Sequence, residues 1–255
     1  MARSRRGPAG IRAGHNGGVS PNEIAPQNQP EAQYSAKLTG DRGSTPEETL
    51  QWRKQDVRTL WRARRRELGE DERAAQSGAL TRHVLDWYLP RARHRRAAVV
   101  MSYGTEPNTG PLRQALHEAG VEVLVPITEP ERRLSWARWF PGVELARSPV
   151  APIDEPVGER HGLETMSTVD LVLVPAQVVD LRGIRMGQGG GYYDRFLAGV
   201  RRLRQDGDGG PVTVASVFRH ELMTRGFIPA GEFDVPVDGA VTADGFTWFD
   251  DGDEA

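Results

Sequence analysis

The 255-residue sequence contains no cysteine, no long apolar run and no marked excess of charge of either sign. Without cysteine, disulfide bonds, thiolate metal sites and a cysteine nucleophile are excluded, and folding does not require an oxidising compartment. No stretch approaches the roughly 20 apolar residues of a transmembrane helix, and no charged-then-apolar signal peptide opens the chain. These absences predict a cytoplasmic protein without a membrane partner.

The charge balance also limits the choice of partner. The chain has 33 basic and 35 acidic residues and a formal net charge of −2, so no global attraction to nucleic acid is predicted. Basic clusters at residues 62–66 and 91–96 leave an RNA-binding module open, but no RNA motif with interleaved aromatics accompanies them. We expect a monomer with a small-molecule partner and no nucleic acid.

Both ends of the chain have the composition of solvated tails. Residues 1–43 are rich in Gly, Pro, Asn, Ser, Gln and Arg and have scarcely any apolar periodicity, which predicts disorder. The basic start could contact nucleic acid or imitate a transit peptide, but a solvated tail is the favoured interpretation. Residues 249–255 are acidic and are expected to fray. One folded domain is therefore predicted over residues 44–248.

The folded part opens with a helix signal. Thr45 supplies a side-chain oxygen as cap, Pro46 stands where its missing N–H costs nothing, and Glu48 completes a capping box. Gly69 ends this helix, and a second helix is predicted over residues 70–88. Apolar residues at helical spacing form the buried stripe of the first helix: Leu50, Val57, Leu60, Trp61 and Leu68.

The middle of the chain alternates strands and helices. Strands are predicted over residues 97–103 and 121–125 with a helix over 111–119 between them, and further buried strands over 169–174 and 212–218. This βαβ order predicts an α/β fold in which ligands bind at the carboxyl ends of parallel strands. Glu106 follows the first strand and so lies at such an end, although the sequence alone favours a turn or helix-capping carboxylate.

A glycine loop is the most informative feature of the sequence. Gly187, Gly189, Gly190 and Gly191 lie between the buried run at 169–174 and a helix predicted over residues 192–200. Glycine allows positive φ and close approach of a ligand to the backbone. A loop that enters a helix start offers free N–H groups and the positive end of the helix dipole, which favours phosphate. A tight connection without a ligand is the alternative for the glycines alone.

The residues beside the loop strengthen the phosphate hypothesis. Arg185 before the loop can place a guanidinium on phosphate oxygens, and Asp194 after it can hold a hard cation. The loop is not a Walker motif, because no Gly-Lys-Ser/Thr follows, and Tyr192 stands where the dinucleotide pattern needs its third glycine. The set indicates a nucleoside triphosphate with its metal.

The stretch Arg185-x-Gly-x-Gly-x-Gly-Tyr-Tyr-Asp194 closely resembles the signature of the 5-formyltetrahydrofolate cyclo-ligase family, and the preceding Asp170-Leu-Val-Leu-Val-Pro175 resembles its approach strand. The resemblance covers roughly residues 54–242. It implies a single three-layer α/β domain of the NagB/RpiA/CoA transferase-like type with a mostly parallel central sheet. It also implies conversion of 5-formyltetrahydrofolate to 5,10-methenyltetrahydrofolate with ATP and Mg²⁺, releasing ADP and phosphate.

The resemblance also implies residue roles. Lys54 and Arg58 are four residues apart and share a helix face; a solvated surface is the reading without the family, and the family implies that they reach the ATP phosphates. Glu106 would bind the pterin, since a carboxylate accepts two N–H donors. The ATP site would comprise Lys54, Arg58, Arg185, Gly187, Gln188, Gly189, Gly190, Gly191, Tyr192 and Tyr193, and the folate site Glu106, Gln188, Gly189, Gly190, Gly191 and Tyr192.

Four residues carry the expected chemistry. Arg185 and Tyr192 would be catalytic, with Tyr192 as hydrogen-bond donor nearest the formyl group, whose oxygen is phosphorylated before N10 attacks. Asp194 and Asp234 would hold Mg²⁺, which keeps several waters and so needs few carboxylates.

Several residues depart from the family pattern, and a non-catalytic folate- or nucleotide-binding paralogue is therefore the alternative interpretation. The family usually has glutamine at Glu221 and often histidine at Phe233, and Gln188 also varies. His220 is expected at the surface. Trp136 or Trp139 could stack on folate rings, although core packing is favoured, and Glu155 is a loose match to a family position.

Overall fold

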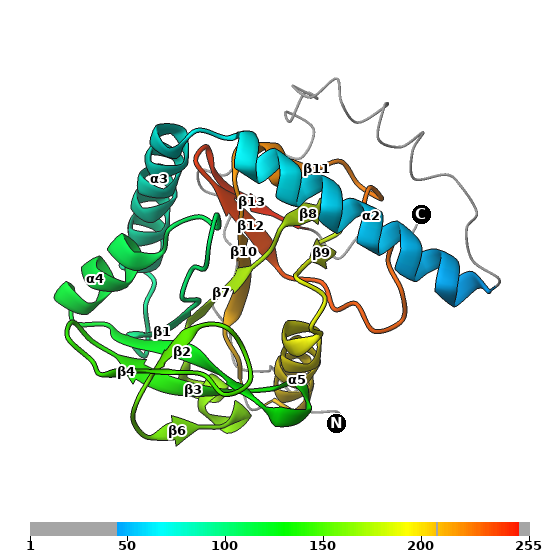
Figure 1. The fold of residues 1–255 in the computed structure, drawn as a ribbon. Coiled ribbons are helices and arrows are strands. Elements are labelled where there is room, and N and C mark those ends of the chain that lie inside the picture. The colour runs from blue at the N-terminus through cyan, green and yellow to red at the C-terminus, as the bar shows by residue number, and fades with distance from the viewer. Residues whose placement is uncertain (1–44, 208, 250–255) are drawn as a thin grey trace, which may run out of the picture.

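The computed structural model describes residues 45–207 and 209–249. The predicted tail at residues 1–43 and most of the acidic tail lie outside the described residues. A large sheet forms the middle of the molecule and helices cover it (Figure 1). Its strands in chain order are β1 (Arg96–Val99), β2 (Glu122–Glu129), β3 (Arg133–Trp139), β6 (Arg160–His161), β7 (Leu171–Pro175), β10 (Val212–Ser216), β12 (Gly239–Thr242) and β13 (Gly245–Trp248).

These eight strands lie in the order β13-β12-β10-β7-β1-β2-β3-β6. The four central pairs, from β12–β10 to β1–β2, are parallel, and the outer pairs are antiparallel. The predicted α/β class with a mostly parallel central sheet is confirmed. The helices are α2 (Pro46–Glu67), α3 (Glu70–Tyr88), α4 (Gly110–Glu118) and α5 (Tyr192–Asp206), with short 3₁₀ turns η1 (Pro130–Arg132), η2 (Leu163–Thr168) and η3 (Arg219–Glu221).

The central strands are apolar on both sides because helices cover both faces of the sheet. Leu171 and Leu173 face a cluster that contains Leu80 and Leu112 of α3 and α4. Val172 and Val174 face the opposite cluster, which contains Phe196 of α5. The alternation along β7 therefore separates two core layers, and the molecule has three layers as the family resemblance implied.

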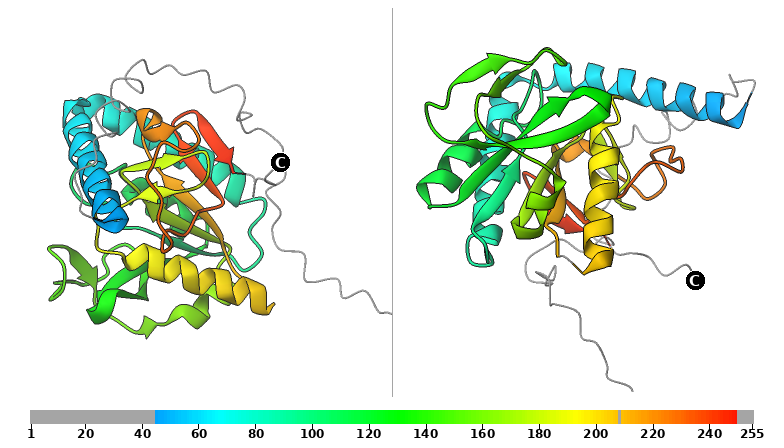
Figure 2. Two further views of the ribbon diagram at one scale, coloured as in Figure 1. Left: turned by 90° about the vertical axis from the view of Figure 1, so that its right-hand side faces the viewer. Right: turned by 90° about the horizontal axis from the view of Figure 1, so that it is seen from below.

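Helix α2 packs on a smaller sheet. Its capping box forms as predicted, since Thr45 Oγ1 accepts from the Glu48 amide at 3.2 Å and Glu48 Oε2 accepts from the Thr45 amide at 2.9 Å. Val57 and Trp61, both fully buried, pack with Ile228. The small sheet comprises β11 (Leu222–Met223), β8 (Val178–Asp180) and β9 (Arg185–Met186), and α2 crosses it diagonally (Figures 1 and 2).

The structure differs from the prediction in several connections. The β8–β9 hairpin lies between β7 and the glycine loop, where the sequence indicated a direct passage from strand to loop. The strand predicted over residues 97–103 ends at Val99, because Thr109 Oγ1 donates to Val100 O at 2.6 Å and Ser102 Oγ donates to Pro107 O at 2.6 Å. These side chains satisfy a compact turn that carries Glu106.

Two further segments contribute to the outer part of the fold. The proline-rich segment over residues 149–156 contains β5 (Asp154–Pro156), which pairs with β4 (Leu145–Arg147). Phe249, expected to start the fraying tail, packs partly buried against the core and donates its amide to Asp238 O at 2.9 Å. In the described part of the chain, no helix is both long and apolar enough to span a bilayer.

Candidate active site

The glycine loop forms the expected helix entrance. Gly191 is the N-cap of α5 and has φ of +74°. The first N–H groups of a helix have no intrahelical partner, and Gly191 has no side chain that could accept from them. Gly189 has φ of +99°, and a Cβ there would lie 3.3 Å from the Arg58 guanidinium. The loop is therefore glycine-rich for both backbone conformation and close approach, and its free N–H groups suit an anion.

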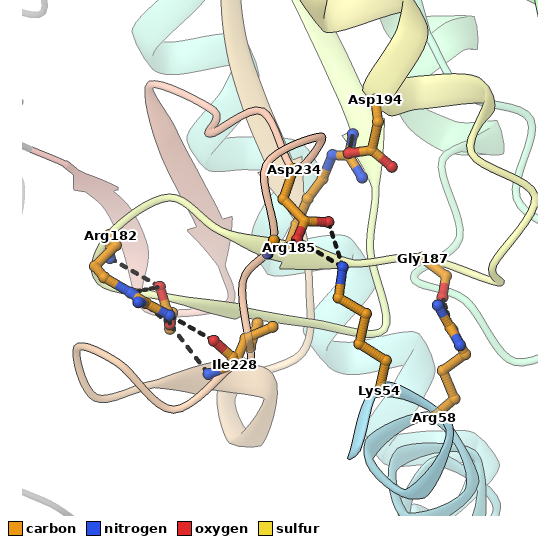
Figure 3. Close-up of polar contacts among 10 residues, drawn as sticks. Lys54, Arg58, Arg182, Arg185, Gly187, Asp194, Ile228 and Asp234 are labelled. Carbon is orange, nitrogen blue, oxygen red and sulfur yellow. Dashed lines mark hydrogen bonds and ion pairs between the residues drawn. The ribbon is translucent and has the colours of Figure 1, made fainter. Parts of the chain in front are cut away.

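Helix α2 supplies three cations to this region, and Figure 3 shows two of them, Lys54 and Arg58. Lys54 Nζ donates to the Asp234 carboxylate at 2.6 and 2.8 Å. Arg58 Nε donates to Gly187 O at 3.3 Å. Arg62, one helical turn further, donates to Gln188 Oε1 at 2.9 Å. The spacing of four residues thus directs Lys54 to Asp234 and Arg58 to the glycine loop, and Arg62 is a third cation that the sequence reasoning did not assign.

Arg185 is a buried arginine with an unsatisfied nitrogen. Its side chain is 3% exposed, and Nη2 donates to Asp194 Oδ1 at 2.9 Å. Its Nε has no hydrogen-bond partner among the described residues. Burial lowers the pKa of Arg185, and Asp194 opposes that shift. The guanidinium is therefore not the free fork that the sequence suggested, because one arm is already held by Asp194 (Figure 3).

The two aspartates lie on separate elements beside the same arginines. Asp194 is in the first turn of α5, and Asp234 is in the loop after Ile228 and accepts the Gly231 amide at 2.6 Å. Both aspartates interact electrostatically with Arg58 and Arg185. Within the described ranges, no cluster of three or more His, Asp or Glu side chains forms a metal site. A metal here would need most of its ligands from elsewhere.

Asp180 fixes the hairpin that precedes the loop. It is fully buried, accepts the Ile228 amide at 3.1 Å and forms an ion pair with Arg182 at 2.7 Å (Figure 3). Its bond to Ile228 ties the β8–β9 hairpin to the segment that ends in Asp234. Asp180 is thus a structural residue that joins the hairpin before the glycine loop to the segment that carries Asp234.

Glu106 meets the glycine loop from the end of β1. Its carboxylate accepts the Tyr103 amide at 3.1 Å and is hydrogen-bonded to the Gln188 side chain. Burial raises the pKa of Glu106, while the Tyr103 amide, Arg65 and Gln188 oppose the rise. Gln177 also donates to Gln188 Oε1, at 2.8 Å, and its own Oε1 is buried without a partner among the described residues. Gln177 is a site residue that the sequence reasoning missed.

The two tyrosines after the loop occupy different positions. The Tyr192 ring lies over Gly190, where an added Cβ would be 2.9 Å from the ring. Tyr193 points inward, with its centroid 6.0 Å from the Arg185 guanidinium. The Tyr193 hydroxyl is buried without a partner in the part of the chain that the structure describes, and burial raises its pKa. Tyr192 is therefore the tyrosine available at the loop surface.

A buried ion pair lies below Glu106. Arg65 and Glu221, with side chains 2% and 0% exposed, form a bidentate contact at 2.5 and 2.9 Å. Arg65 also donates to Ala176 O, and Glu221 accepts the Phe218 amide at 2.9 Å. Glu221, where the family usually has glutamine, is thus bound by Arg65 of α2 inside the protein. Arg65 lies on the same helix as Lys54 and Arg58, but no local sequence signal connects it with Glu221.

His220 lies in a different environment from the one predicted. His220 is not a surface histidine: its side chain is 21% exposed and its ring stacks on Phe218, because η3 turns it inward. Burial and the nearby Arg64 and Arg65 lower the pKa of His220 to about 4.

The remaining aromatic and acidic candidates lie in the core, at the surface or against strand β2. Trp136 is fully buried in the core and Trp139 is half-buried against it, which confirms core packing for both. Phe233 is 80% exposed. Glu155 is buried and accepts the Thr128 amide at 2.7 Å, so its contact is to strand β2.

The chain is similar to known proteins over most of its described residues. The model of the 5-formyltetrahydrofolate cyclo-ligase family matches residues 51–243. The 5-formyltetrahydrofolate cyclo-ligase of Escherichia coli K12 is 30% identical over 184 residues, covering 71% of this chain and 95% of that protein. The Mycolicibacterium smegmatis protein of the same name is 29% identical over 194 residues, covering 74% and 93%.

Solved structures agree with this match. The Aquifex aeolicus 5,10-methenyltetrahydrofolate synthetase has a TM-score of 0.62 and 26% identity, covering 79% of this chain and 95% of that one. The Mycoplasma pneumoniae 5,10-methenyltetrahydrofolate synthetase has a TM-score of 0.57 and 15% identity, covering 74% and 98%, and shows the shared fold.

Proposed function

The chain belongs to the 5-formyltetrahydrofolate cyclo-ligase family, and on that premise we propose that it converts 5-formyltetrahydrofolate to 5,10-methenyltetrahydrofolate at the expense of ATP. One observation carries the proposal. A glycine loop at an uncapped helix start lies among Lys54, Arg58 and Arg185, and Glu106 meets the same loop through Gln188. A phosphate site and a carboxylate suited to a pterin thus share one loop.

The reaction needs a better leaving group than a formyl oxygen. In our proposal the formyl oxygen takes the γ-phosphoryl group, so that its O–P bond forms while the bond from the γ-phosphorus to the ADP oxygen breaks. N10 then attacks the formyl carbon, loses its proton, and the carbon–oxygen bond breaks to release phosphate. Phosphoryl transfer depends mainly on positioning and charge neutralisation. The site therefore needs cations and amides more than a strong base.

The residues present fit a nucleotide triphosphate. The amides at the start of α5 and of the loop glycines can donate hydrogen bonds to phosphate oxygens. Arg58 lies across Gly189, and Arg185 holds a buried Nε that is unsatisfied among the described residues. A ligand oxygen at this nitrogen would remove the penalty of a buried unpaired donor. We therefore assign phosphate binding to Lys54, Arg58, Arg185 and the loop.

The carboxylates fit Mg²⁺ that arrives with the nucleotide. We assign Asp194 and Asp234 to it, since Mg²⁺ usually takes one or two carboxylates and completes its shell with waters and phosphates. When bound, Mg²⁺ would neutralise phosphate charge. Before that, Lys54 and Arg185 neutralise Asp234 and Asp194 respectively. Lys54 and Arg185 could then bind phosphate when Asp234 and Asp194 bind the metal.

A direct assay tests the proposed function. Purified protein with 5-formyltetrahydrofolate and MgATP should produce the absorbance of the methenyl product, and omission of ATP should abolish it. Calorimetric titration with each ligand should accompany the assay. Binding of folate or nucleotide without product would contradict the proposal and favour a non-catalytic paralogue.

Tyr192→Phe tests the hydrogen-bond donor at the loop surface. We place the Tyr192 hydroxyl nearest the formyl group because its ring covers Gly190 at the loop. The variant should lower kcat about tenfold or more, the effect of losing one donor to a charged or developing-charge acceptor, while KM for ATP changes little. Tyr193→Phe is not a matched control because its hydroxyl is buried. An unchanged kcat would reduce Tyr192 to a packing residue.

The folate affinity should depend on pH through Glu106. Burial raises the pKa of this carboxyl above its ordinary value. The ionised form accepts an N–H group on each oxygen, whereas the protonated form carries an O–H donor on one of them. Affinity is therefore expected at a pH above this raised pKa and should be lost as pH falls through it. KM for 5-formyltetrahydrofolate, measured between pH 5 and 8, should rise toward the acid end.

A matched variant separates Glu106 from other titrating groups. Glu106→Gln keeps the shape but removes the titration, so KM should be higher throughout and flat across that range. A wild-type KM that does not change with pH, or a Glu106→Gln profile that keeps the acid rise, would remove Glu106 from folate recognition.

A further inference from the structure

The hairpin between β2 and β3 has a strained tip. Its loop comprises residues 130–132, since Glu129 pairs with Arg133. Glu131 and Arg132 have φ of +59° and +57°, and Arg95 is the only other non-glycine residue with positive φ in the described ranges. Hairpins normally place glycine or asparagine at such positions. Two charged residues held in this conformation indicate a site where position matters more than local stability.

The strained tip is held against the glycine loop. Arg195 of α5 donates through Nη1 to Glu131 O at 2.6 Å. The hairpin extends from the central sheet to the start of α5 (Figure 2, right view). A Cβ added to Gly191 would lie 3.7 Å from Cδ and 3.8 Å from Nη1 of Arg132. The Arg132 guanidinium therefore lies beside the residue that caps α5.

Arg132 has no internal role that would explain this placement. Its side chain is exposed, and in the described ranges it makes no hydrogen bond or ion pair. Its neighbour Arg133 differs, because it is 3.8 Å from Glu131. Arg58 contacts the same loop at Gly189 from α2. Two guanidinium groups from distant parts of the chain thus lie at Gly189 and Gly191, beside the free amides of the helix start.

We propose that Arg132 is a further nucleotide-binding residue, which the strained β2–β3 hairpin holds beside the glycine loop to bind a phosphate group. This inference rests on the proposed function, because it names the same nucleotide site. A guanidinium binds phosphate through two parallel N–H donors. The amides of the α5 start favour an anion at the same place. Arg58 of α2 and Arg132 of the β2–β3 hairpin supply positive charge beside them.

Because residue 132 has a positive φ, a glycine variant removes the Arg132 side chain without destabilising the fold, so a change in ATP binding can be assigned to the side chain. Arg132→Gly removes the guanidinium and also relieves the positive φ, so its thermal midpoint should equal or exceed that of the wild type. Its KM for ATP should rise about tenfold, as expected for loss of a charge-assisted contact. Its kcat and its KM for 5-formyltetrahydrofolate should change less than about twofold, which is within the weak effects of a residue outside the folate site.

Glu131→Gly is the matched control. It relieves strain at the adjacent position, leaves the main-chain acceptor of Arg195 in place and keeps the Arg132 side chain, so KM for ATP should be unchanged. A rise in KM for the folate rather than for ATP in Arg132→Gly would overturn the proposal and assign Arg132 to a folate carboxylate. Equal loss of ATP affinity in both variants would also overturn it, since hairpin shape would then be the cause.

Direct binding separates this inference from the proposed function. Calorimetric titration of the wild type and of Arg132→Gly with MgADP requires no turnover. Weaker binding by Arg132→Gly supports the role of Arg132 even if the wild type forms no methenyl product, in which case the proposed function alone fails. Equal MgADP and MgATP affinities in the two proteins would overturn the inference while the proposed function stands.

Discussion

Replacing Arg185 with alanine should reduce ATP-dependent methenyl formation at least about 10²–10³-fold, the range for losing one preorganised donor to a developing charge. Among the described cations of the loop region, Arg185 is more deeply buried than Lys54, with a side chain 3% exposed against 11%. Its Nε faces no partner among the described residues. A hydrogen bond from a buried donor to phosphate is strong, because no water competes with the ligand.

The stability of this variant should change much less than its activity. Alanine leaves Asp194 without its cation, but Asp194 is 28% exposed and water can solvate it. Circular dichroism melting should therefore show a folded protein, while the spectrophotometric assay shows the loss. Arg201→Ala, an exposed arginine on the same helix, is the matched control and should retain full turnover. Near-wild-type turnover of Arg185→Ala would remove Arg185 from the mechanism.

Asp194→Ala is a less clear test of the same pair. It removes the carboxylate that we assign to Mg²⁺, and it also leaves a guanidinium that is 3% exposed without its partner. Removing one member of a buried pair usually destabilises a protein by about 3–5 kcal/mol. A loss of activity could then come from folding. Arg185→Ala avoids this ambiguity because the group left behind is the more exposed one.

The sequence was most informative where the signal was local. The capping box at Thr45 and Glu48 forms, and the second helix has the predicted bounds, Glu70–Tyr88. Both depend on residues within a few positions of one another. The family signature around the glycine loop also lies within ten residues, and the loop-to-helix entrance at Tyr192 is observed. Local capping, periodicity and turn chemistry therefore carried the fold class and the centre of the site.

The sequence was least informative where the partners lie far apart. Arg65 and Glu221 are separated by 156 residues, and nothing near either residue indicates the other. The β8–β9 hairpin was missed because its strands have only three and two residues, which is too short for a periodic pattern. The Arg132 turn was missed since Pro130 to Arg133 contains no glycine or asparagine to indicate positive φ. Tertiary contacts decide each of these features.

Replacing Arg65 with methionine should destabilise the protein by about 3–5 kcal/mol, the usual effect of breaking a buried ion pair. The thermal midpoint should fall by on the order of 10 °C for a domain of this size. Glu221 is fully buried, and without Arg65 its nearest remaining donor is the Phe218 amide at 2.9 Å. One hydrogen bond cannot replace a bidentate guanidinium, so Glu221 would hold an uncompensated charge or take up a proton.

The pH dependence of the Arg65→Met variant identifies the cause. Burial raises the pKa of Glu221, and Arg65 opposes that rise; removing Arg65 should raise this pKa further. A carboxyl whose pKa is higher in the folded state than in the unfolded state holds a proton that unfolding releases, so stability falls as pH rises between the two values. The deficit in thermal midpoint should therefore be larger at pH 8 than at pH 5.

A double variant distinguishes the charge from the packing. Arg65→Met with Glu221→Met removes both charges at similar volume, and such replacements of buried pairs are often neutral or stabilising. The double variant should recover most of the lost midpoint and its pH dependence should vanish. If the double variant melts as low as Arg65→Met, the Arg65 side chain stabilises the protein through its bond to Ala176 O and its packing, and the ion pair is not the cause.

The same variants connect the buried pair to the site above it. Arg65 is on the helix that carries Lys54 and Arg58, and its contacts join the second half of α2 to the ends of β7 and η3. If this anchorage positions the cations, Arg65→Met should raise KM for ATP at temperatures well below its midpoint, and the double variant should restore stability without restoring that affinity. Full recovery of both would show that the other contacts of α2, among them the packing of the fully buried Val57 and Trp61 with the small sheet, position it without Arg65.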